Sequence, residues 1–151
     1  MTRAVVAAAF MMTVAEAAGV PVCMAVSESD ARAILGPSAK RTKDPSGCGW
    51  ETTDHPKKQM NVARVGVASM FETARQDGIS KGPTKAENDL GGPAFSTIPS
   101  AQKGASASIC MLKDGGVLIV EIEGFEPGGA ESHLPQVRNL VRKLGPSMAK
   151  E

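Results

Sequence analysis

One stretch of this chain leaves little freedom in how it folds: two apolar runs that flank Asp114-Gly115. An Asp-Gly pair suits a two-residue type I′ hairpin turn, because both central positions of that turn need positive φ. The turn sets a register that pairs Leu112 with Val117 and Met111 with Leu118. In this register one face is wholly apolar, and a slip of one residue would mix the two faces. That face consists of Ala107, Ile109, Met111, Leu118, Val120 and Ile122.

An apolar hairpin face needs helices to cover it, and both ends of the sequence supply one. Ser27 with Asp30 has the spacing of a capped helix start, and Gly36-Pro37 predicts the end of that helix. We expect a last helix from about Ser132 or Leu134 to Leu144, closed by Gly145-Pro146. Its apolar stripe is Leu134, Val137, Leu140, Val141 and Leu144.

The segments between these helices are less strongly patterned. We expect strands over 47–53 and 60–67, a helix from the capping-box spacing Ser69-x-x-Glu72 to Gly78, a mobile polar connection over 79–92 and a short edge strand over 93–98. In the second strand, Ala63, Val65 and Val67 should share a face. The resulting order α-β-β-α-β-β-β-α predicts an α+β fold, an antiparallel sheet of about five strands flanked by helices.

The first residues have the pattern of a cleavable secretory signal. Arg3 provides a positive charge, residues 4–14 are small or apolar apart from one threonine, and Ala15-Glu16-Ala17 provides a peptidase site. We therefore expect a signal peptide over 1–17, a single α+β domain over 18–151 and a periplasmic or secreted location. The apolar run is too short for a stable membrane span. The alternative is a buried N-terminal helix in a cytosolic protein.

The chain has three cysteines, and an oxidising compartment favours a disulfide. Of the three single pairings we favour Cys23 with Cys48, which would join the start of the first helix to the first strand. No Cys-x-x-Cys spacing exists, so the bond should be structural. Cys110 is then a free thiol, which we expect to be buried and inert; a reactive thiol or an intermolecular bond is the alternative. Val20-Pro21-Val22 before Cys23 argues against lipid anchoring.

Charge and composition exclude several partners. The formal net charge is +1, and the chain has one tryptophan, four phenylalanines and no tyrosine, so nucleic-acid binding is not expected. The basic clusters Lys40-Arg41-x-Lys43 and Lys57-Lys58 fall in segments that we expect to be solvated loops. No motif of a nucleophile, a phosphate-binding loop or a metalloprotease helix occurs. The sequence thus predicts a protein that is not an enzyme and has no cofactor.

The two histidines are the remaining candidates for chemistry. Glu131-x-His133 and Asp54-His55 could each provide two ligands, but zinc and copper sites need three or four. We expect no metal site. A metal-binding or metal-dependent protein that uses His133 with Glu131 is the alternative function.

Several short motifs form an ordered set: Cys23, Leu35-Gly36, Cys48-Gly49-Trp50 and, before the hairpin, Leu90-Gly91-Gly92-Pro93-Ala94. This set resembles small exported bacterial proteins and lipoproteins of unknown function with a PsbP-like α/β sandwich domain. The resemblance implies that the two early cysteines pair, and it implies no catalytic residues.

These observations predict an exported envelope protein of non-enzymatic function, a binding or accessory module. Its partner would be an envelope protein or a small ligand, recognised by the 79–92 connection on a rigid scaffold. We expect a monomer, with a dimer through Cys110 as the alternative.

Overall fold

The computed structural model describes residues 22, 24–43 and 48–149. The signal peptide predicted over 1–17 and Cys23 lie outside the described residues. The sheet has seven strands where the sequence predicted about five, and every pairing in it is antiparallel. The α+β class is confirmed. In chain order the elements are α2 (Glu28–Leu35), β1 (Lys40–Arg41), β2 (Gly49–Glu51), β3 (Gln59–Val65), α3 (Met70–Lys81), β4 (Thr84–Glu87), β5 (Ala94–Thr97), β6 (Ala107–Lys113), β7 (Gly116–Glu123) and α4 (Leu134–Met148), with short 3₁₀ turns at Ser100–Gln102 and Glu131–His133.

The β6–β7 hairpin has the predicted register, in which Leu112 pairs with Val117 and Met111 with Leu118. Asp114 and Gly115 have φ values of 50° and 76°, as a type I′ turn requires. The six apolar residues of the predicted face are all buried. Local turn chemistry and burial therefore select the same register.

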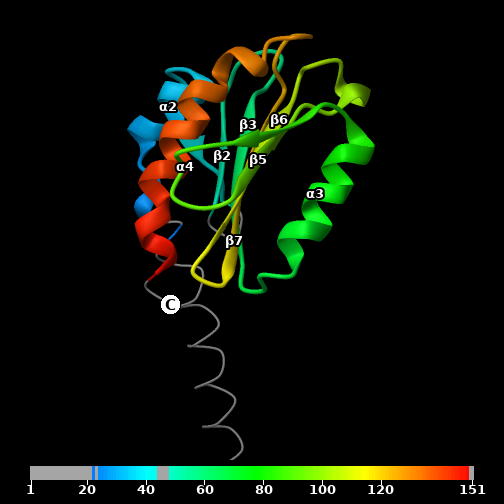
Figure 1. Cartoon of the computed structure of the whole chain (residues 1–151). Helices are drawn as coiled ribbons and strands as arrows, with labels where there is room; N and C mark the ends of the chain where they lie inside the picture. The colour runs from blue at the N-terminus through cyan, green and yellow to red at the C-terminus, as the bar shows by residue number, and fades with distance from the viewer. Residues whose placement is uncertain (1–21, 23, 44–47, 150–151) are drawn as a thin grey trace, which may run out of the picture.

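The strands are ordered β1-β2-β3-β7-β6-β5-β4, so β7 lies at the centre, between β3 and β6. Figure 1 shows α2 and α4 together on one face of the sheet and α3 alone on the other. The α2/α4 face carries the main core, and the α3 face carries a smaller cluster around Phe95, Cys110 and Val117. No helix in the described part of the chain is long and apolar enough to cross a membrane.

The first helix starts and ends as predicted. The Ser27 hydroxyl accepts a hydrogen bond from the Asp30 amide, and the Asp30 carboxylate accepts one from the Ser27 amide. Gly36, at φ 113°, ends the helix.

The other two helices differ from prediction at their ends. Ser69 has helical dihedrals and makes no capping bond, because a capping residue needs an extended backbone. The α3 helix continues through Gly78 to Lys81. Similarly, α4 continues through Gly145-Pro146 to Met148. An internal proline costs roughly 3 kcal/mol, and the burial of Met148, 1% exposed, offsets much of that cost.

The strand predictions were correct only in part. Ala63 and Val65 share the α3 face of β3 as predicted, but Val67 lies beyond the strand, and the core face consists of Met60 and Val62. Lys40 and Arg41 form edge strand β1 rather than a loop, and the Arg41 guanidinium lies 4.9 Å from the Trp50 ring centroid. The predicted connection over 79–92 holds the end of α3 and all of β4. Because β4 lies outside β5, β5 is not an edge strand.

Candidate functional site

Strand β4 forms the open edge of the sheet between α3 and α4. The Ile98 amide donates to the Pro83 carbonyl at 3.0 Å, and the register places Lys85 opposite Ser96. Hydrogen-bonded and non-bonded pairs alternate along an antiparallel ladder. Lys85 and Glu87 therefore turn their amide and carbonyl groups toward β5. The backbone groups of Thr84 and Ala86 point outward, away from the sheet.

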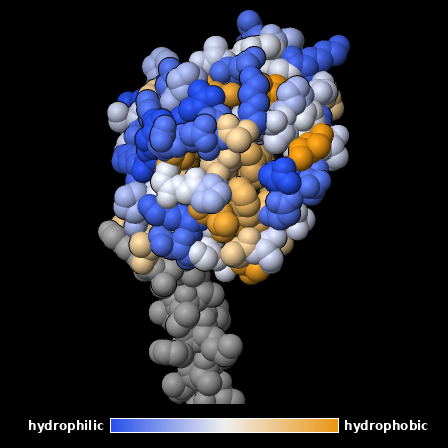
Figure 2. Space-filling model, in the orientation of Figure 1, coloured by the Kyte–Doolittle hydropathy of each residue, from blue (hydrophilic) through white to orange (hydrophobic). Residues whose placement is uncertain are grey.

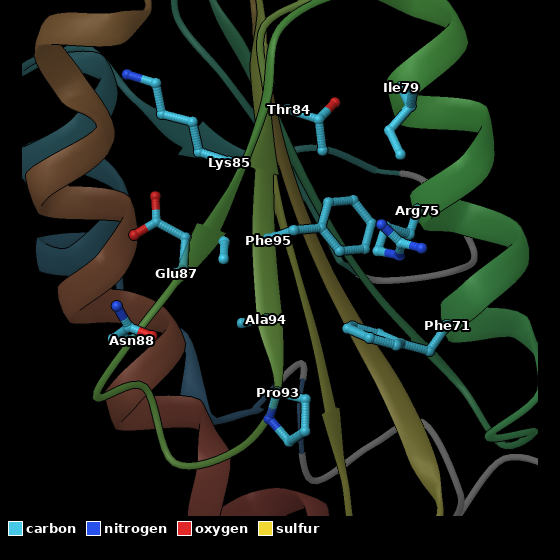
Figure 3. A pocket seen from close by; sticks show the side chains of 11 residues that line it. Phe71, Arg75, Ile79, Thr84, Lys85, Glu87, Asn88, Pro93, Ala94 and Phe95 are labelled. Carbon is cyan, nitrogen blue, oxygen red and sulfur yellow. The ribbon is translucent and has the colours of Figure 1, made fainter.

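Side chains along β4 alternate between two faces. The Thr84 hydroxyl lies 3.1 Å from that of Thr97, and Ala86 lies opposite Phe95, so both side chains are on the α3 face. Lys85 and Glu87 extend toward α4 instead (Figure 3).

On the α3 side, a groove of about 330 Å³ runs beside the strand. Phe71 of α3 and Phe95 of β5 face each other across it, with ring centroids 5.4 Å apart (Figure 3). Ile79 adds an apolar side chain that is 49% exposed. Figure 2 shows apolar residues gathered along this edge within a hydrophilic surround.

On the α4 side, a second groove of about 360 Å³ follows the same strand. Lys85 and Ser96 line it from the sheet, and Leu134, Pro135 and Arg138 line it from α4. Lys85 lines both grooves. The exposed edge therefore lies between two hollows, one on each side of the sheet.

The charges near the edge are mostly paired. The Arg138 guanidinium donates two hydrogen bonds to Glu87, at 2.8 and 2.9 Å, and thereby lowers the pKa of that carboxyl. Two further pairs lie within α3, Arg75 with Glu72 and Lys81 with Asp77. Lys85 is exposed and forms no ion pair with any residue that the structure describes. Its charge adds through space to the lowering of the Glu87 pKa, but it has no direct ionic partner among these residues.

A third hollow, of about 290 Å³, brings the two histidines together, which sequence spacing did not predict. His55 and Asp54 line it from the turn between β2 and β3, and His133 lines it from the turn before α4. The His133 ring lies 4.6 Å from that of Phe125. Burial, and secondarily the charge of Lys58, lower the pKa of His133.

The structure also places the two residues of the metal alternative. Glu131 lines the α4-side groove, whereas His133 lines the third hollow, so the predicted pair of ligands is split. Among the described residues, no three histidine, cysteine, aspartate or glutamate side chains converge in a way that could hold a metal ion.

The cysteines lie on different parts of the fold. Cys110 is a free thiol, 3% exposed, on the α3 face of β6. Burial raises the pKa of the Cys110 thiol to about 12. Cys48 is half-buried beside the main core, just before β2. Because Cys23 lies outside the described residues, the pairing of Cys23 with Cys48 stays a prediction.

Comparison of the chain with models of protein families, with curated proteins and with solved structures gives no match. The resemblance to PsbP-like domains therefore stays a prediction.

Sequence reasoning did point to the 79–92 segment as the recognition surface, but as a mobile connection. The open edge within it is strand β4. Thr84-Lys85-Ala86-Glu87 has a weak period of two, with both charged residues on one face, and Pro83 before it limits where it can begin. That alternation was the signal available.

Proposed function

We propose that this chain is an exported, non-enzymatic module that binds an extended segment of another protein along strand β4. One observation supports this most: an unpaired strand edge that is flanked by a groove on each face. An extended peptide adds to such an edge by main-chain hydrogen bonds, and its alternate side chains enter pockets on either side.

The small size of the exposed edge is consistent with selective binding. β4 has four residues, and it carries a lysine, a feature that discourages unspecific edge-to-edge association. A segment that fits both grooves gains contacts that a flat, unmatched strand does not. The geometry thus favours a specific protein partner over a small ligand.

Site-specific photocrosslinking in living cells tests this proposal. A benzophenone amino acid would replace Ala86 on β4 and, as a matched control, Lys40 on the opposite edge strand; both residues are exposed. We expect a discrete heavier adduct from position 86 and none from position 40. Equal adducts at both positions, or none at position 86, would contradict binding at this edge.

Export rests on the pattern of residues 1–17 and is tested separately. We expect protein isolated from the cell envelope to begin at Ala18. Protein that begins at Met1 and remains in the cytosol would contradict export without affecting the binding proposal.

A further inference from the structure

The geometry points to a segment with an apolar–acidic–apolar pattern as the occupant of the β4 edge. This inference rests on the proposed function and deepens it by naming the chemistry of the partner.

The open backbone groups fix where partner residues align. Only Thr84 and Ala86 direct their amides and carbonyls outward within β4, as the pairing with β5 requires. A partner strand at the usual spacing of about 4.8 Å would bond to these two residues. Three consecutive partner residues are then placed opposite Thr84, Lys85 and Ala86.

Residues directly opposite each other in a sheet lie on the same face. The partner side chains opposite Thr84 and Ala86 therefore lie on the α3 face, beside the groove lined by Phe71, Ile79 and Phe95. Because that groove is apolar and partly exposed, apolar side chains should gain most there. The middle side chain enters the α4-side groove instead.

The middle position faces Lys85, which lines this groove and forms no ion pair with any described residue. The other groups around this groove are Glu87, which binds Arg138, and Glu131 in the turn before α4. Glu131 lies in the 3₁₀ turn before α4, whereas Lys85 is the residue of β4 that the middle partner position faces directly. An acidic partner residue directly opposite Lys85 therefore meets a lysine without an ion pair among the described residues, whereas a basic one meets a like charge.

Eight-residue peptides labelled with a fluorophore test the pattern by anisotropy. One carries Val-Glu-Val at its centre, a second Val-Lys-Val and a third Ser-Glu-Ser. We expect the wild-type chain to bind Val-Glu-Val about fivefold more tightly than Val-Lys-Val, the upper range for a cross-strand charge pair. Loss of the two apolar side chains should weaken binding about tenfold or more.

Charge reversal on the protein supplies the matched comparison. Lys85→Glu should reverse the order of the two charged peptides, whereas Lys40→Glu, the same change on the β1 edge, should preserve it. An unchanged order in Lys85→Glu would overturn the inferred pattern.

Two changes to backbone hydrogen bonding distinguish a wrong side-chain pattern from a failure of the proposed binding at β4. Ala86→Pro removes an outward amide and no β4–β5 bond, a change tolerated on edge strands. It should weaken all three peptides, with an unfolding midpoint close to that of the wild type. Methylation of the peptide amides tests the same bonds on unaltered protein.

If these changes weaken binding while Lys85→Glu keeps the wild-type order of the two charged peptides, β4 is the binding edge but the inferred apolar–acidic–apolar pattern is wrong. If neither change weakens binding, strand addition at β4 is wrong as well. A wild-type dimer that Ala86→Pro dissociates, seen by sedimentation, would assign the edge to a second copy and overturn a peptide occupant.

Discussion

The residues on the two faces of this sheet are buried to different extents. On the α2/α4 face, the inward residues of β6 and β7 are buried almost completely, and two helices cover them. On the α3 face one helix covers a smaller cluster, and Phe71, Leu112 and Ile119 are only partly buried. Stability thus comes mainly from one face, which leaves the other free to carry an exposed groove beside β4.

The largest expected effect comes from Ile122→Ala. Ile122 is 0% exposed on the α2/α4 face, and truncation there should cost about 2–5 kcal/mol of unfolding free energy. Ile119→Ala, on the same strand and the opposite face, is the matched control. Because Ile119 is half-buried, its truncation should cost less than that of Ile122, by at least about 1 kcal/mol. Urea unfolding measures both. Equal costs would abolish the contrast between the faces.

Gly78→Ala probes how closely α3 approaches the sheet. A Cβ at Gly78 would lie 2.5 Å from the Thr97 hydroxyl oxygen, so we expect a loss of about 1–3 kcal/mol despite the better helix propensity of alanine. Thr97→Ala removes that oxygen, and the double variant should recover part of the loss. Additive costs would show that α3 does not press on Thr97.

Glu87→Gln tests the ion pair that ties β4 to α4. Glu87 is 9% exposed in its side chain, and loss of its charge should cost about 1–2 kcal/mol near neutral pH. Because Arg138 lowers the folded-state pKa of Glu87 below the ordinary 4.5, the contribution is present above pH 4.5 and disappears as pH falls through the lowered pKa. Urea unfolding of both proteins from pH 7 to pH 3 measures this. A difference that persists at the lowest pH would contradict the ion pair as its source.

The mildest test leaves the fold unchanged and follows the Cys110 thiol. With a pKa near 12, it should react with a disulfide reagent at pH 8 about a thousandfold more slowly than an ordinary cysteine, since the thiolate is the reactive form. Phe71→Ala, which thins the α3 cover, should accelerate the reaction. A fast wild-type reaction would mean that the α3 face is open.

The sequence predicted elements well where turn chemistry and apolar alternation agreed, as in the β6–β7 hairpin and α2. It missed β1 because both residues of this strand are exposed and charged, which leaves no alternation to detect. Gly78 and Gly145 were interpreted as helix ends, yet each permits close packing against a neighbour that only the fold brings near. β4 was missed as a strand because it is short, largely polar and only weakly alternating, and because α4, whose Arg138 pairs with Glu87, lies far along the chain.

The strand order has a further consequence. β1, β2 and β3 form one consecutive meander, β4 to β7 form another, and within the sheet the two meet only where β3 pairs with β7. The connection from β3 to α3 passes through the exposed residues 66–69. A chain cut there would leave two pieces that share the seven-residue β3–β7 seam and the packing of α2 against α4, which is the arrangement that a split reporter needs.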